Sequence, residues 1–166
     1  EKIEKWLTGG APVEVRSLSV ANTGKAETVT GCDLPVRSGM SIASNSSLAS
    51  AGGDDLVFSG AEDATLYGLS RISGFAAIVC TNAGKALLFG SAANDTLTVE
   101  ATSSLLLGGT AAEPVRLWPV EALSTWQVNL SSSAASSVKY VSVSNSNASA
   151  GTTVLAINST DLGGNS

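Results

Sequence analysis

The sequence predicts an all-β domain, and among all-β architectures it favours a β-solenoid, in which successive coils of chain stack on one another. Short apolar segments recur along the chain about 8 to 12 residues apart, mostly separated by clusters of Gly, Asn, Asp and Ser. Several segments change their alternation partway. Val138 and Tyr140 are out of step with Val141 and Val143, as expected where a chain turns a corner. An antiparallel β-sandwich with the same strand spacing is the alternative.

The composition agrees with a narrow core. Hydrophobic residues make up 43% of the 166 residues but aromatic residues only 5%. The interior is therefore expected to hold mainly Ala, Ser, Val and Leu, which suit the limited width of a solenoid. Charged residues make up 14%, below the roughly 25% of an average soluble domain. Ser, Thr, Asn and Gly are expected to cover the surface instead.

The charge balance and the lack of histidine argue against several classes of function. Lys and Arg number 9 against 14 Asp and Glu, a net charge of −5. Nucleic acids and anionic membrane surfaces both attract clustered basic residues, so neither partner is expected. With no histidine, the chain lacks the usual imidazole base and a common zinc ligand. No apolar run approaches the roughly 20 residues of a membrane helix, so no membrane insertion is expected.

Residues 1–10 are expected to form a capping helix and a turn, followed by a solenoid domain over residues 11–166. Ile3, Trp6 and Leu7 share one helix face at i, i+3 and i+4, and the Thr-Gly-Gly that follows ends the helix. A helix this short is marginal alone. Its apolar stripe therefore predicts contact with the first coil, whose open strand edges it would cover.

Short strands are expected throughout the rest of the chain. Their ranges are 13–20, 28–36, 56–58, 66–69, 76–80, 87–89, 97–99, 105–107, 115–118, 126–130, 138–143 and 154–157. Trp126, Val128 and Leu130 alternate with polar residues, which predicts one buried and one solvated face. At about 20 to 25 residues per coil, the chain would make roughly six or seven coils and a rod about 30 Å long.

The segment 95–166 resembles a module repeated in large bacterial surface and secreted proteins. In that family an LxLxGT…P(V/I)xL coil leads into a strand with Trp and Asn, then a VxYVxVSxSxAS coil and an NSTDxGxN motif. The matching residues are Leu105, Leu107, Gly108, Pro114, Val115, Leu117, Trp126, Val128, Asn129, Tyr140, Val143, Ser146, Ala148, Ser149, Asn158, Ser159, Thr160, Asp161 and Gly163. The resemblance implies a right-handed parallel β-helix exported to the cell exterior. The family usually continues with a short Trp-containing strand, so we expect the last coil to be open, or to be completed by further residues or by a neighbouring molecule.

The acidic residues are expected to be solvated charges in turns. A glycan hydrolase or lyase would need paired carboxylates across one groove. No acid–base cluster recurs at coil spacing, so no catalytic residue is predicted. The glycine-rich stretch 52–68 is faintly similar to a calcium-binding roll, but its glycine register fails. Asp161 is expected to form an Asx-type turn in preference to an ion site with Asn158. We expect no metal and no cofactor.

Two pairs of residues have alternative interpretations. Cys32 and Cys80 allow one disulfide, which would need an oxidising compartment, or they are two small buried thiols. Trp118 and Trp126 flank the segment VEALS. If exposed, they could stack on sugar rings or contact the end of another module. If buried, they are apolar plugs of a packed edge loop, which we favour.

Together these features predict a non-catalytic extracellular structural module of a bacterial surface protein, such as a stalk, an adhesin segment or a filament subunit that stacks end to end. Its expected partners are further copies of itself or neighbouring coils of a longer chain. The alternative is a glycan-binding or glycan-cleaving β-helix, with aromatic and acidic side chains aligned along one face of successive coils. The sequence begins at Glu1, so we interpret it as a processed or excised piece.

Overall fold

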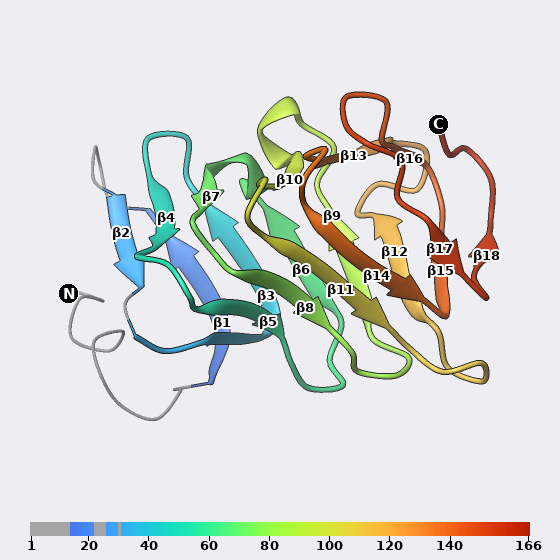
Figure 1. The fold of residues 1–166 in the computed structure, drawn as a ribbon, viewed down its shortest axis with the longest axis horizontal. Helices are drawn as coiled ribbons and strands as arrows, with labels where there is room; N and C mark the ends of the chain where they lie inside the picture. Colours follow the sequence, from blue (N-terminus) through green and yellow to red (C-terminus); the bar gives the residue numbers. More distant parts are fainter. Residues whose placement is uncertain (1–13, 22–25, 30) are drawn as a thin grey trace.

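The computed structural model describes residues 14–21, 26–29 and 31–166 (Figure 1). These residues form eighteen strands and two short 3₁₀ helices, η2 (Leu69–Arg71) and η3 (Ala93–Asp95), and none of their helices is long and apolar enough to cross a membrane. The strands are β1 (Val15–Val20), β2 (Ala26–Val29), β3 (Leu34–Ile42), β4 (Ser47–Ser50), β5 (Asp55–Phe58), β6 (Ala64–Tyr67), β7 (Ile72–Ser73), β8 (Ala77–Cys80), β9 (Ala86–Phe89), β10 (Leu97–Val99), β11 (Ser104–Gly108), β12 (Val115–Pro119), β13 (Trp126–Leu130), β14 (Ala135–Lys139), β15 (Val141–Val143), β16 (Ser146–Asn147), β17 (Ala156–Ile157) and β18 (Thr160–Asp161).

Parallel pairing dominates the structure. All fifteen strand pairings among the described residues are parallel. Parallel neighbours cannot be joined by tight hairpins, so the chain must travel away from each strand before returning beside it. The expectation of an all-β fold is confirmed, and the antiparallel sandwich is excluded for this part of the chain.

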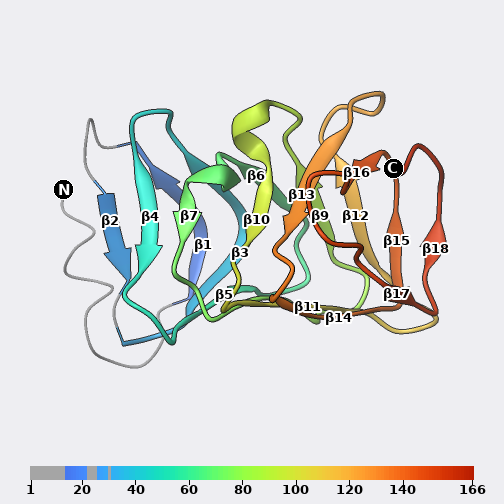
Figure 2. The same cartoon turned by 45° about the horizontal axis from the view of Figure 1, so that its top comes forward.

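The strands belong to three sheets. One twelve-stranded curled sheet has the order β17-β14-β11-β8-β5-β3-β6-β9-β12-β15-β18, with β1 paired to β3. Two three-stranded sheets, β2-β4-β7 and β10-β13-β16, follow one another along the stack (Figure 2). From β5 onward each strand of the long sheet pairs with the strand three further along the chain, so we call each set of three a layer: β8–β10, β11–β13 and β14–β16 are three successive layers. β17 and β18 form the last layer.

The corner predicted at Tyr140 is confirmed. Tyr140 separates β14 from β15 and has a φ of 50°, a left-handed conformation that few non-glycine residues adopt. The turn in the backbone explains why the side chains before and after it change phase. Val138 and Val141 both face the interior and are buried.

Other sequence expectations differ from the structure. The strand expected at 28–36 is wrong, because the chain bends between β2 and β3, where Gly31 has a φ of 74°. β4 and β7 were not expected, since their sequences SLAS and IS offer few large apolar side chains. The capping helix with Ile3, Trp6 and Leu7 lies outside the described residues.

Equivalent side chains form rows through the interior. Leu34, Leu56, Ile78 and Leu105 pair in register from β3 to β11 and are all buried. Each fully buried side chain of this kind contributes about 1.5–3 kcal/mol relative to an exposed one. The core is therefore a set of rows of apolar side chains, and each row crosses successive strands at right angles to them.

Candidate functional site

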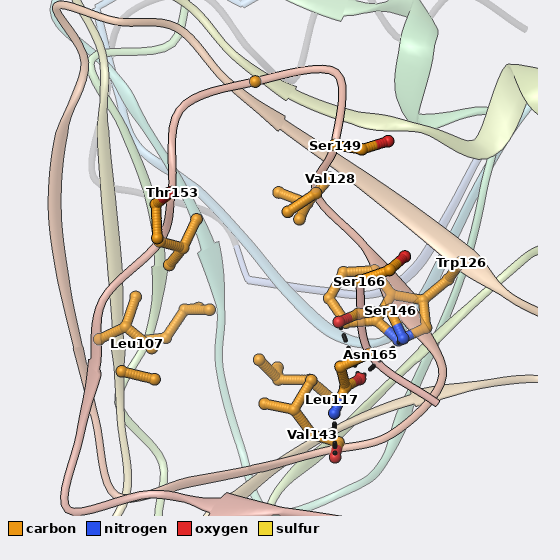
Figure 3. Close-up of a pocket in the computed structure, with 15 residues that line it drawn as sticks. Leu107, Leu117, Trp126, Val128, Val143, Ser146, Ser149, Thr153, Asn165 and Ser166 are labelled. Atoms are coloured by element: carbon orange, nitrogen blue, oxygen red, sulfur yellow. Dashed lines mark hydrogen bonds between the residues drawn. The ribbon is translucent and has the colours of Figure 1, made fainter. Parts of the chain in front are cut away.

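The interior opens at the C-terminal end of the stack into a cavity of about 590 Å³ (Figure 3). Apolar side chains from three layers make most of its wall, and hydroxyl and amide groups add polar atoms. The lining residues are Leu107, Leu117, Trp126, Val128, Val138, Val143, Ser146, Ala148, Ser149, Gly151, Thr153, Val154, Ala156, Asn165 and Ser166. A volume of this size lies within the roughly 300–1,000 Å³ range of binding pockets.

The short last layer leaves this cavity open. β17 and β18 contain two residues each, and residues 148–155 between β16 and β17 contain no strand. β17 pairs with Val138 and Lys139 of β14 and does not extend to Ala135. The last layer is therefore too short to cover all the apolar side chains of the layer before it.

One apolar row ends in a carboxylate. Leu87, Leu117 and Val143 pair in register, and Asp161 takes the next position on β18. Asp161 Oδ1 accepts a hydrogen bond from the Gly163 N–H at 2.7 Å, which is the expected Asx-type turn. Within the described ranges, no group of three or more His, Cys, Asp or Glu side chains could hold a metal ion.

Asn165 connects this turn to the layer before it (Figure 3). Its Nδ2 donates to the Val143 carbonyl at 3.3 Å, a bond drawn in Figure 3, and to Asp161 Oδ1 at 2.6 Å. Its Oδ1 accepts from both the main-chain N–H and the hydroxyl of Ser146, each at 2.9 Å. Asn165 therefore has both polar atoms of its side chain bonded and holds the last layer against β15 and β16.

Apolar side chains and strand edges are exposed at the same end. Leu155, Ile157 and Leu162 are 72%, 55% and 54% exposed. β17 and β18 are the outermost strands of the long sheet, so each pairs on one side only among the described strands. An edge of this kind is a template for pairing with another strand.

The two predicted tryptophans lie in different environments. Trp126 is buried in the cavity wall, where its ring stacks on Phe89 at 4.2 Å and its Nε1 donates to the Ser144 carbonyl at 2.9 Å. Trp118 is half-buried on β12, in a groove outside the core. The structure does not bring them together as one contact surface. Trp126 belongs to the end cavity and Trp118 to the groove.

Several carboxylates accept main-chain hydrogen bonds between layers. Asp33 Oδ1 accepts from the Asp55 N–H at 2.9 Å, and Glu100 Oε2 accepts from the Gly74 N–H at 2.8 Å. Asp95 is buried and accepts from the Gly68 N–H at 2.5 Å. These acidic residues lie near turns, as expected, but their carboxylates also accept hydrogen bonds from main-chain N–H groups. They replace carbonyl acceptors that a regular strand ladder would supply.

Lys85 is the buried ionisable residue that the sequence analysis missed. It is 0% exposed, and its Nζ donates to the carbonyl oxygens of Arg37, Ser59 and Glu62. Burial lowers the pKa of Lys85, and the nearby carboxylates of Asp63 and Glu62 oppose that effect. No sequence pattern marks Lys85, because it follows Asn-Ala-Gly in what reads as an ordinary solvated turn.

The disulfide between Cys32 and Cys80 is not formed. Cys32 precedes β3 and Cys80 ends β8, and β5 lies between these strands. Two strand spacings of about 4.8 Å already exceed the roughly 7 Å limit between disulfide-bonded Cα atoms. Burial raises the pKa of the Cys80 thiol to about 11. The buried-thiol interpretation therefore holds for Cys80.

Comparisons with family models, with curated proteins and with solved structures each find no match to this chain. The resemblance of residues 95–166 to bacterial surface modules stays a prediction.

Proposed function

We propose that this protein is a non-catalytic structural module of a bacterial surface protein, folded as a right-handed parallel β-helix and working outside the cell. The parallel pairing of each strand of the long sheet from β5 onward with the strand three further along supports the β-helix. The resemblance of residues 95–166 supports the handedness and the exterior location. A surface poor in charge and rich in hydroxyl groups suits an exposed rod. Carboxylates such as Asp95, engaged by main-chain N–H groups, support a structural role over catalysis.

The open C-terminal end carries the more specific proposal that modules stack end to end. A second copy that paired a strand with β17 or β18 would satisfy their exposed main-chain edges. The same contact would cover Leu155, Ile157 and Leu162 and close the 590 Å³ cavity. Contacts that join different faces of two copies can continue without closing, so they produce a filament.

The oligomeric state of the purified chain tests this proposal. Analytical ultracentrifugation over a range of concentrations should show concentration-dependent assembly, and negative-stain electron microscopy should show particles elongated along one axis. Ile157→Lys should weaken assembly, because it places a charge on the exposed edge strand β17. Leu123→Lys is the matched control, since Leu123 is 99% exposed between β12 and β13, outside the last layer. Monomers at every concentration, or equal assembly of both variants, would contradict end-to-end stacking.

A further inference from the structure

A second recess lies on the outside of the long sheet. It has a volume of about 450 Å³ and is lined by residues that include Asp63, Leu88, Arg116, Trp118, Pro119 and Ser144. Leu88 of β9 pairs with Trp118 of β12. Leu117, which precedes Trp118 on the same strand, is buried in the core. Strand alternation therefore directs Leu88 and Trp118 outward, side by side, on two adjacent layers. We call this recess the Trp118 groove.

Arg116 and Asp63 form the polar side of the Trp118 groove. Arg116 Nη2 donates to Asp63 Oδ1 at 2.9 Å and to the Gly84 carbonyl at 2.9 Å. Its guanidinium carbon lies 5.2 Å from the centre of the Trp118 ring. Asp63 Oδ1 also accepts from the Ala86 N–H at 2.9 Å. These contacts fix both charged groups before any ligand binds, and they pair the positive charge with a negative one.

The indole N–H of Trp118 is unsatisfied. Trp118 Nε1 is buried and has no hydrogen-bond acceptor within the part of the chain that the structure describes. Trp126 differs, since its Nε1 has the Ser144 carbonyl as acceptor. An indole N–H normally finds an acceptor when it is buried. The wall of the groove therefore contains an unpaired donor, covered by protein atoms, beside apolar side chains and a fixed Arg–Asp pair.

We infer that the Trp118 groove binds a neutral hexopyranose unit of a glycan. A pyranose ring has an apolar face of C–H groups, which would pack on Leu88 and on the part of Trp118 that Arg116 does not cover. Its edge carries adjacent hydroxyl groups that both donate and accept. Those hydroxyls would donate to Asp63 Oδ2 and accept from the remaining N–H groups of Arg116. This binding site is independent of end-to-end stacking.

The charge of the groove selects among sugars. Arg116 is already neutralised by Asp63, so a uronic acid would gain no free cation and would meet the Asp63 carboxylate. A neutral sugar meets no such repulsion. The groove therefore prefers neutral glycans to acidic ones, which separates sugar recognition from general attraction of anions.

A glycan array and direct titration test this inference. The array should contain neutral and acidic oligosaccharides, and calorimetric titrations should then use its best neutral ligand and tetragalacturonate. Binding of a neutral glycan is expected, with tetragalacturonate at least tenfold weaker. Trp118→Ala and Arg116→Gln should each weaken binding at least tenfold. Asp63→Asn should weaken it less, since an amide oxygen still accepts from the Ala86 N–H.

Tyr67→Ala is the matched control, because Tyr67 is an aromatic residue that is 40% exposed on β6 and does not line the groove. Each variant's melting temperature establishes that it is folded, and Trp118→Phe replaces Trp118→Ala if the latter unfolds. Trp118→Phe should also weaken binding, because a phenyl ring offers less apolar surface to the sugar than an indole ring does. No neutral glycan bound up to about 10 mM, a preference for tetragalacturonate, or equal loss in Tyr67→Ala would overturn the assignment.

Discussion

Lys85 Nζ lies 2.5 Å from the carbonyl oxygen of Arg37, 48 residues earlier in the chain. The same ammonium group donates to the Ser59 carbonyl at 2.9 Å and to the Glu62 carbonyl. An ammonium group has three N–H donors, and here each has a main-chain acceptor. Arg37 belongs to β3, Ser59 and Glu62 lie between β5 and β6, and Lys85 precedes β9. One side chain therefore joins three successive passages of the chain.

Lys85→Met should destabilise the protein by about 2–5 kcal/mol, because it keeps an unbranched apolar stem but leaves three buried carbonyl groups without their donor. Urea unfolding followed by circular dichroism measures the change. Lys139→Met is the control, since Lys139 is exposed on β14, and it should change stability by less than about 0.5 kcal/mol. Similar losses in the two variants would show that the three carbonyl contacts contribute little.

Asp55→Asn should stabilise the protein at pH 7. Burial, followed by the charge of Asp33, raises the pKa of Asp55, and Asp54 adds to the effect. A carboxyl group with a raised folded-state pKa favours folding when protonated, and this contribution is lost as the pH rises through that pKa. Asparagine removes the charge and can still accept a hydrogen bond. The gain should be at most about 1 kcal/mol.

The pH dependence separates this effect from a general change in packing. Thermal melts of Asp55→Asn and the parent protein should differ at pH 7 and converge near pH 3, where the aspartate is itself largely protonated. Glu121→Gln, at an exposed acid outside this cluster, should give no such pattern. A difference of the same size at both pH values would rule out the charge as its cause.

Cys80 should resist alkylation in the native protein. Its pKa of about 11 leaves roughly one thiol in a thousand as thiolate at pH 8, and the side chain is also 0% exposed. The measurement uses Cys32→Ser, so that Cys80 is the one remaining cysteine, with iodoacetamide labelling followed by mass spectrometry. Labelling should be slow in buffer and complete in concentrated urea. Equal labelling rates in both conditions would mean that the β8 interior is open to solvent.

Gly68→Ala should be more destabilising than Gly31→Ala. The two glycines have nearly equal φ angles, 75° and 74°, so the strain of the left-handed conformation is shared. A Cβ at Gly68 would lie 2.2 Å from the Ile42 carbonyl oxygen, whereas a Cβ at Gly31 would meet nothing within 4 Å. We expect about 1 kcal/mol for Gly31→Ala and at least about 2 kcal/mol more for Gly68→Ala. Equal losses in urea unfolding would mean that neighbouring layers separate freely at this turn.

Sequence reasoning succeeded where a local pattern determines the structure. The phase change around Tyr140 predicted a corner because side chains alternate strictly along a strand and the turn interrupts that alternation. The alternation of Trp126, Val128 and Leu130 predicted a strand with a buried face for the same reason, and all three are buried. Both features can be predicted from neighbouring residues alone.

Sequence reasoning failed where the surroundings of a side chain come from residues far away in the chain. The carbonyl groups that accept from Lys85 lie 48, 26 and 23 residues earlier, so its own neighbours do not reveal its burial. β4 was missed because Leu48 is the one large apolar residue in SLAS, and its pairing with Ile72 across the layers stabilises it. The groove beside Trp118 depends likewise on Asp63, which strand pairing brings close.

Because of the contacts of Lys85, the region from β3 to β9 should unfold more slowly than the C-terminal strands. In a one-dimensional stack, opening can start at an end and propagate from one unit to the next. The region from β3 to β9 is joined across several units by one ammonium group, so it should open as a single cooperative block. In the last layer the Asn165 side chain reaches one preceding layer, whereas Lys85 joins three passages of the chain, so amide hydrogens in the last layer should exchange first. The C-terminal strands would then open and close reversibly while the region from β3 to β9 stays folded.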